Sequence, residues 1–244
     1  MMSSTEHRYS SETSHEPNQI GLDSIGSTTA SLDTDSSDLH LHAVILAGGQ
    51  GMRLGNVSKA DLVISGKRLL TTVLRGLEPY VGGTVVVVAP PTVSVPSGVI
   101  RTMEDPPLGG PLAGVAAGLD KLETQLDSDL VVVCAVDTPR IGDLLPLLKH
   151  AFTFNESDDA DGAVALTGGA EAQVQYLQGI YRLGALRSRL SEVPKLRNSK
   201  VRTALEPLNL YTVAVPASMS RDVDTPADIA WWMDQFGEPP VLPL

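Results

Sequence analysis

The chain has 244 residues, of which 42% are hydrophobic and 19% charged, and this is enough to build one α/β domain with its own core. It contains no run of eighteen apolar residues, so we expect no membrane-spanning segment. The formal net charge of −11 argues against a nucleic-acid-binding protein, because such proteins neutralise phosphates with a basic face.

Residues 1–40 are rich in serine, threonine and acidic residues and contain few large apolar side chains. Such a segment buries too little apolar surface to offset the entropy of ordering, so we predict a disordered tail before a folded domain at residues 41–244. The start of the chain has neither the apolar core of a secretory signal nor an arginine-rich transit pattern. With Cys134 as the single cysteine, these features favour a cytoplasmic protein without disulfide bonds.

From Leu41 onward, short apolar runs alternate with amphipathic stretches, which is typical of βα units around a mostly parallel sheet. The predicted strands are Ala43–Ala47, Thr84–Ala89, Val99–Thr102, Leu130–Val136, Gly162–Leu166, Gln178–Arg182 and Leu210–Val215. The predicted helices are Leu69–Tyr80, Pro111–Leu126, Gly142–Phe152, Ala185–Val193, Arg197–Glu206 and Pro226–Phe236. This order predicts a single Rossmann-like three-layer domain, in which ligands bind beyond the carboxyl ends of the strands.

The stretch LAGGQGMRLGNVSK, residues 46–59, follows the first predicted strand and contains four glycines with Arg53 and Lys59. Glycines let phosphate oxygens approach backbone N–H groups, and the two cations add positive charge. The spacing fits neither the dinucleotide-binding GxGxxG pattern nor a P-loop. The alternative interpretation is a tight strand-to-helix connection with solvated cations.

Two acidic segments end at the same predicted edge of the sheet. Asp137 follows the strand Leu130–Val136, where its carboxylate could hold Mg²⁺ or cap the next helix. In the segment DVDTP, Asp222 and Asp224 alternate and would point the same way if the segment is extended. The same segment is equally typical of a helix start with proline at the first position.

These segments together resemble the molybdenum cofactor guanylyltransferases, nucleotidyltransferases of the nucleotide-diphospho-sugar transferase fold. The resemblance rests on the glycine stretch, ISGKRLL (64–70), EDPPLGGPLAG (104–114), VVVCAVDTP (131–139) and DVDTPADI (222–229), and covers residues 43–236. Three positions, Ser58, Asp61 and Arg140, depart from the family's usual pattern.

The resemblance implies an enzyme that uses Mg²⁺ to transfer GMP from GTP to molybdopterin with release of pyrophosphate. It implies catalytic roles for Arg53, Lys59 and Asp137, and metal binding by Asp137 and Asp224, with Asp222 as an alternative to Asp224. The nucleotide-binding residues that it implies are Leu46, Ala47, Gly48, Gly49, Gly51, Arg53, Lys59, Asp105, Gly110, Pro111 and Leu112.

The acceptor side of the site is less clearly marked in the sequence. By the same resemblance, Gln173 and Gln175 face the acceptor, and surface exposure is the other interpretation. A cytidylyltransferase, a transferase acting on another phosphorylated small molecule, and a nucleotide-binding relative without turnover stay open as alternatives, as do protein partners in cofactor delivery.

Overall fold

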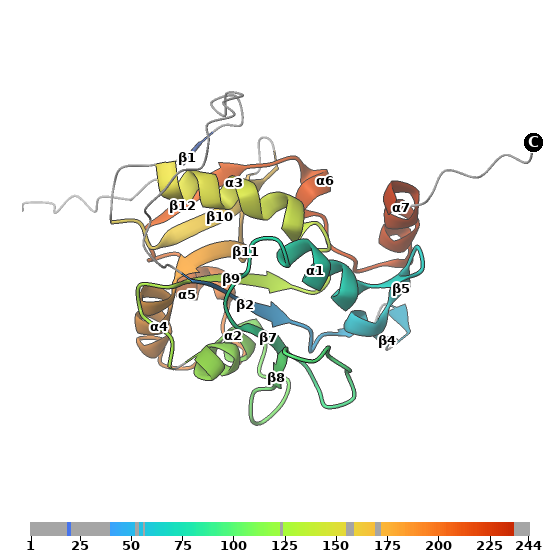
Figure 1. Cartoon of the computed structure of the whole chain (residues 1–244), viewed down its shortest axis with the longest axis horizontal. Coiled ribbons are helices and arrows are strands. Elements are labelled where there is room, and N and C mark those ends of the chain that lie inside the picture. Colours follow the sequence, from blue (N-terminus) through green and yellow to red (C-terminus); the bar gives the residue numbers. More distant parts are fainter. Residues whose placement is uncertain are drawn as a thin grey trace, which may run out of the picture.

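The computed structural model describes residues 19–20, 40–51, 54–55, 57–122, 124–154, 159–168 and 172–236. An eight-stranded sheet forms the centre of the molecule, in the order β1-β12-β10-β11-β9-β2-β7-β8 (Figure 1). Its strands are β1 (Gln19–Ile20), β2 (Leu41–Leu46), β7 (Val85–Val88), β8 (Ile100–Thr102), β9 (Leu130–Ala135), β10 (Gly162–Thr167), β11 (Gln173–Arg182) and β12 (Leu210–Ala214). Only β11 runs antiparallel to its described neighbours, which confirms the mostly parallel sheet.

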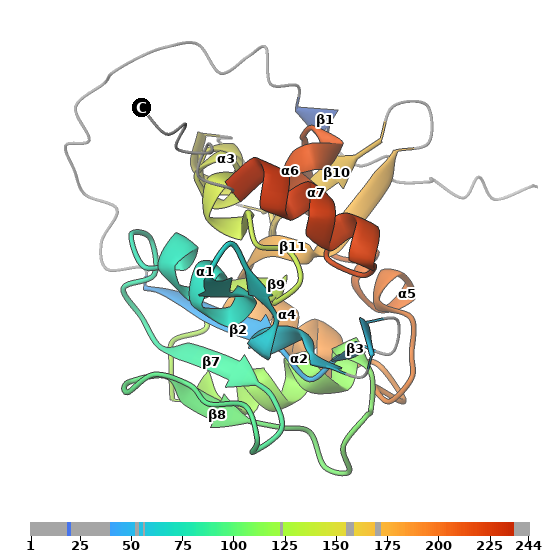
Figure 2. The ribbon, with the colours of Figure 1, turned by 90° about the vertical axis from the view of Figure 1, so that its right-hand side faces the viewer.

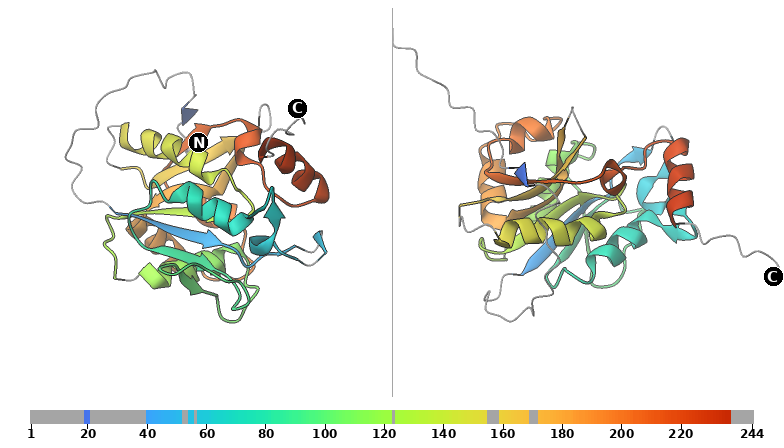
Figure 3. Two further views of the ribbon diagram at one scale, coloured as in Figure 1. Left: turned by 45° about the vertical axis from the view of Figure 1, so that its right-hand side comes forward. Right: turned by 90° about the horizontal axis from the view of Figure 1, so that it is seen from above.

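Helices cover both faces of this sheet, so the domain has three layers (Figure 3). One face packs against α1 (Leu69–Leu77) and α3 (Ile141–Phe154), and the other packs against α2 (Pro111–Leu119), α4 (Leu183–Ser191) and α5 (Val201–Leu205). Two short helices follow β12, namely α6 (Ala217–Ser220) and α7 (Pro226–Phe236). Two two-stranded sheets, β3 (Gln50–Gly51) with β4 (Val57–Ser58) and β5 (Val63–Ile64) with β6 (Lys67–Arg68), lie between β2 and α1 in the chain.

The alternation of side chains between the two faces of each strand explains the three layers. In β2, Ala43 and Ile45 belong to the hydrophobic cluster under α1 and α3, whereas Val44 belongs to the cluster under α2 and α4. Successive strand side chains point to opposite faces, so a continuous apolar run supplies both cores. In β9, Cys134 is fully buried among apolar neighbours, and this burial raises the pKa of its thiol to about 12.

Several predicted boundaries are wrong. The strand predicted to start at Gln178 begins at Gln173, because Gln173 to Gln175 pair with β10 beyond a bulge at Val164 and Ala165. The helix predicted from Arg197 begins only at Val201, because the residues before it form a turn that binds another loop. The helix predicted over Pro111–Leu126 ends at Leu119 and continues as a 3-10 turn, Asp120–Leu122.

Two residues of the segment predicted to be disordered, Gln19–Ile20, form β1 and pair in parallel with β12. Apart from these two and His40, residues 1–40 lie outside the described part, so their disorder stays a prediction. None of the helices in the described ranges has the length and hydropathy needed to cross a bilayer.

Candidate active site

A cavity of about 1120 Å³ lies at the carboxyl edge of the parallel strands. Figure 2 looks onto this edge, with α6 and α7 on one side and α2 and β3 on the other. The ends of β2, β7 and β9 contribute Leu46, Val88 and Ala135 to its lining. The cavity therefore occupies the position at which an open α/β sheet binds its ligands.

The first wall of the cavity is the start of the glycine stretch, where Gly48 and Gly49 follow β2. Neither glycine has a positive φ, and a Cβ added to Gly48 or Gly49 would lie 3.8 or 4.0 Å from its nearest neighbouring atom, which is ordinary contact. Because the fold does not require glycine at either position, we infer that the missing side chains leave room for a ligand. Gly51 lies in β3, and Arg53 lies outside the described residues.

Lys59 is the cation of this wall, and it joins the two acidic segments. Its Nζ donates to Asp137 Oδ2 at 2.6 Å and also to Asp224 Oδ1. Burial by itself lowers the pKa of Lys59, but attraction and hydrogen bonds from Asp137 and Asp224 outweigh burial and raise the pKa. The lysine is therefore protonated at neutral pH. A Cβ on Gly49 would lie 4.0 Å from Lys59 Cδ, so the lysine side chain runs beside the glycine stretch.

Three carboxylates, Asp137, Asp222 and Asp224, lie close enough to Lys59 to interact with its charge. Asp222 lines the cavity, and its pKa is raised by burial and then by the charges of Asp224 and Asp137. Within the described residues, no group of three His, Cys, Asp or Glu side chains is arranged to hold a metal ion. Mg²⁺ needs only one or two carboxylates when substrate phosphates complete its shell. Asp137 and Asp224 already converge on one cation, the Lys59 ammonium, so the donor set fits Mg²⁺.

The second wall is formed by the loop before α2 and by the start of that helix. Glu104, Leu108, Gly110 and Pro111 line the cavity, whereas Asp105 is exposed and is not among the lining residues. Gly110 adopts a φ of +84° directly before Pro111, the first residue of α2, and both residues line the cavity, so the helix N-terminus lies at the cavity. Free N–H groups at a helix N-terminus favour negatively charged ligands.

Two of the predicted nucleotide-binding residues belong to the core. The Leu112 side chain is fully buried in the core between α2 and the sheet, and the main-chain N–H of Ala47 donates to Val88 O at 2.8 Å. Neither is among the lining residues of the cavity. Only the backbone of Leu112 remains available for the predicted contact, because its side chain fills the core.

The sequence did not predict the hydrogen bonds from Arg197 and Asn198 that hold the loop before α2 in place. Arg197 donates to the carbonyl oxygens of Pro106 and, at 3.3 Å, of Pro107, while the N–H of Asn198 donates to Gly109 O at 2.7 Å. Asn198 has a φ of +57° and lines the cavity beside Gly110. The sequence signal for this contact was the basic segment at residues 195–202, which Asn198 interrupts. Its contact partner lies about ninety positions earlier in the chain, so the segment alone does not reveal it.

The third wall comes from β10, β11 and the segment around α6 and α7. Gln175 lines it and donates from Nε2 to Thr167 Oγ1 at 2.9 Å, whereas Gln173 is exposed. Gln178, with 5% exposure, was expected only as part of a strand, yet it also lines the cavity. The polar side chains of β11 that face the cavity are therefore Gln175 and Gln178.

The positions that depart from the family pattern have local partners or are buried. Asp61 forms an ion pair with Arg68, and Arg140 forms one with Asp143 at 2.6 Å. Ser58 is partly buried, and its Oγ has no hydrogen-bond partner among the described residues. The first two departures therefore lie in surface ion pairs, and neither residue lines the cavity.

The chain is similar to known proteins over most of its length. The family model described as the MobA-like NTP transferase domain matches residues 43–217. A relative from Methylibium petroleiphilum, named molybdenum cofactor guanylyltransferase, is 35% identical over 131 residues, which span 51% of this chain and 60% of the relative.

Two solved structures share the fold. Molybdopterin-guanine dinucleotide biosynthesis protein A from Archaeoglobus fulgidus is 21% identical with a TM-score of 0.55, covering 80% of this chain and 97% of that one. The 2-C-methyl-D-erythritol 4-phosphate cytidylyltransferase from Thermus thermophilus is 19% identical with a TM-score of 0.60, covering 81% and 98%. These likenesses confirm the predicted nucleotide-diphospho-sugar transferase fold. With a family model that matches well over half of its length, the chain belongs to the MobA-like NTP transferase domain family.

Proposed function

We propose that this protein is a guanylyltransferase that joins GMP from GTP to molybdopterin and releases pyrophosphate. The observation that carries the proposal is the contact of Lys59 with Asp137 and Asp224 at a cavity of about 1120 Å³, which Gly49, Lys59 and Asp137 line. The name of the Methylibium petroleiphilum relative supports the choice of GTP and molybdopterin.

In the proposed reaction, an oxygen of the molybdopterin phosphate attacks the α-phosphorus of GTP. The bond from the α-phosphorus to the bridging oxygen breaks, and pyrophosphate leaves. A phosphate monoester has its second pKa near 6, so it is largely dianionic at pH 7 and needs no general base. The proposal is therefore consistent with a cavity in which no described histidine is among the lining residues.

The chemical difficulty is that two anions must approach each other, so positioning and fixed positive charge supply the catalysis. Mg²⁺ held by Asp137 and Asp224 would supply Lewis-acid polarisation of phosphate oxygens. Lys59 carries a full positive charge beside the glycine stretch, where it would pair with oxygens of the triphosphate. The open N-terminus of α2 offers further N–H donors on the same side of the cavity.

A pyrophosphate-release assay with GTP, Mg²⁺ and molybdopterin tests the proposed function directly. We expect release that requires all three components, with little release when CTP replaces GTP. Equal turnover of CTP and GTP would instead support the broader activity of a nucleotidyltransferase without guanine preference. No release with either nucleotide would contradict the proposed function.

Replacing Lys59 by methionine tests the proposed contact with the triphosphate. We expect kcat/KM for GTP to fall about 100-fold, because a charged donor to a phosphate oxygen is lost. The matched control is Lys67→Met, since Lys67 is an exposed lysine of β6 that does not line the cavity. If steady-state kinetics of the two variants were the same, Lys59 would have no role in binding the triphosphate.

A further inference from the structure

The cavity extends on both sides of the end of β9, where Asp137 follows the strand. On one side lie Gly48, Gly49 and the start of α2, which form the part that the proposed function assigns to the nucleotide. On the other side lie β10, β11, α6, α7 and the segment between these two helices, and this side contributes Gln178, Ser220, Arg221 and Trp231 to the lining. This second part, called the distal half here, follows the sheet order, because β11 and β2 flank β9 on opposite sides.

Arg221 is held rigidly in the wall of the distal half. Its Nε and Nη2 donate to Asp228 Oδ1 at 3.2 and 2.8 Å, and its guanidinium carbon lies 4.7 Å from the centroid of the Trp231 ring. A guanidinium stacked on an aromatic face and bound along one edge loses little further freedom when it binds a ligand.

The partner of Arg221 is itself fixed by the start of α7. Asp228 Oδ2 accepts the N–H of Thr225 at 2.9 Å and the Thr225 hydroxyl at 2.7 Å, while the N–H of Asp228 donates to Thr225 Oγ1. This reciprocal pair is a capping box. Asp228 is therefore fixed at the start of α7, and its Oδ1 holds Arg221 in place.

The described lining of the cavity contains two cations, Lys59 and Arg221. Lys59 lies beside Gly49 on the nucleotide side of the cavity, where it pairs with Asp137 and Asp224. Arg221 has one carboxylate partner, and no contact among the described residues engages its Nη1. Ser220, the preceding residue, also lines the cavity, but its hydroxyl is buried, with no hydrogen-bond partner in the described part of the chain. The distal half thus offers the Nη1 group of Arg221 as a donor for an anion.

We propose that Arg221 binds the phosphate of the acceptor substrate and brings it toward the nucleotide across Asp137. The inference rests on the proposed function and assigns the acceptor class, a phosphate monoester, to the distal half. A guanidinium binds phosphate oxygens through paired N–H donors, and here one edge is anchored by Asp228 while the Nη1 donors remain. Arg221 binds the acceptor, whereas Lys59 and the N-terminus of α2 bind the triphosphate.

The test compares the wild-type protein with Arg221→Gln, Arg221→Lys and the control Arg202→Gln. Arg202 pairs with Glu206 on the surface and does not line the cavity. The ligands are molybdopterin, dephosphorylated molybdopterin and inorganic phosphate, titrated against tryptophan fluorescence, because Trp231 lies beside Arg221. Circular dichroism checks that each variant is folded.

We expect wild-type protein and Arg202→Gln to bind molybdopterin at least about 10-fold more tightly than its dephosphorylated form, as a charge-assisted contact predicts. Arg221→Gln should lose this preference, and Arg221→Lys should keep part of it. Affinity for GTP should not change in any variant. Wild-type binding of inorganic phosphate should weaken in Arg221→Gln by a similar factor. An unchanged preference in folded Arg221→Gln, or phosphate affinity independent of Arg221, would overturn the inference.

These titrations separate the inference from the proposed function. Absence of pyrophosphate release by the wild-type protein contradicts the guanylyltransferase proposal, but it leaves the binding of phosphate at Arg221 measurable. Conversely, turnover with an unchanged molybdopterin KM in Arg221→Gln would retain the proposed function and reject the assignment of Arg221.

Discussion

Asp137→Asn is expected to lower kcat for pyrophosphate release by roughly 100- to 1,000-fold while the protein stays folded. Asp137 Oδ2 accepts a hydrogen bond from Lys59 Nζ at 2.6 Å. Both Asp137 and Lys59 line the cavity. An asparagine keeps the shape but removes the negative charge that Mg²⁺ binding needs. The measurement is steady-state kinetics with GTP, molybdopterin and varied Mg²⁺.

The matched control for this experiment is Asp143→Asn. Asp143 lies in α3, is largely exposed and pairs with Arg140 on the surface, so its loss should leave kcat within about twofold of the wild-type value, as for most exposed ion pairs. Near-normal turnover of Asp137→Asn at saturating Mg²⁺ would remove Asp137 from the metal site. Equal losses in both variants would indicate a general effect of negative charge.

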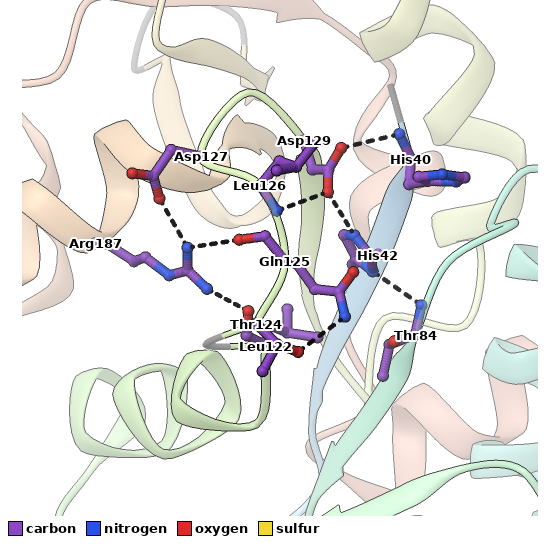
Figure 4. A network of polar contacts seen from close by, with 10 residues as sticks. All are labelled: His40, His42, Thr84, Leu122, Thr124, Gln125, Leu126, Asp127, Asp129 and Arg187. Carbon is purple, nitrogen blue, oxygen red and sulfur yellow. Dashed lines mark hydrogen bonds and ion pairs between the residues drawn. The ribbon is translucent and has the colours of Figure 1, made fainter. Parts of the chain in front are cut away.

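The largest stability effect is expected from Asp129→Ala, at the opposite edge of the sheet (Figure 4). Asp129 is 1% exposed and accepts three hydrogen bonds, from His42 Nε2 at 3.3 Å and from the N–H groups of His40 and Leu126 at 3.2 and 3.1 Å. His42 Nδ1 accepts the N–H of Thr84 at 2.8 Å, so its proton must lie on Nε2. The network joins the amino ends of β2, β7 and β9.

Alanine at position 129 would leave these three donors without a partner, and His42 Nε2 is buried. Such a loss should reduce the free energy of unfolding by about 3–5 kcal/mol, measured by urea denaturation. The control is Asp127→Ala, because Asp127 pairs with Arg187 nearby but is exposed, and we expect a change below about 1 kcal/mol. Similar losses in both variants would show that the buried network has no special role.

The stability contribution of Asp129 should also depend on pH. Burial raises the pKa of this carboxyl, but the hydrogen bonds from His42, His40 and Leu126 outweigh burial and lower it below the usual value. A lowered pKa in the folded state stabilises the protein above the unfolded-state value of about 4, and this contribution is lost as pH falls through the folded-state value. The difference between wild-type protein and Asp129→Ala should therefore narrow below about pH 4. A constant difference from pH 7 to 3 would contradict this account.

Local patterns in the sequence determined the fold class and the identity of the main elements. A continuous apolar run such as Leu130–Ala135 has apolar side chains on both faces of the sheet, so both faces must be covered. The segments with helical periodicity between the strands form the layers that cover them. The acid after that run and the glycines after β2 could be assigned to the carboxyl edge because parallel strands end there together. These inferences need only residues that are close in the chain.

The meeting of particular side chains was decided by the tertiary structure. Lys59 contacts Asp137 and Asp224 across 78 and 165 positions of the chain, and no local pattern encodes which carboxylate it reaches. The turn at Arg197 replaces the helix predicted there, because its hydrogen bonds to the loop before α2 compete with helix formation. Arg221 and Trp231 likewise line the cavity only because α7 packs against β5, which is distant from it in the chain. Composition and periodicity are local properties, whereas a binding site depends on contacts that only chain folding brings together.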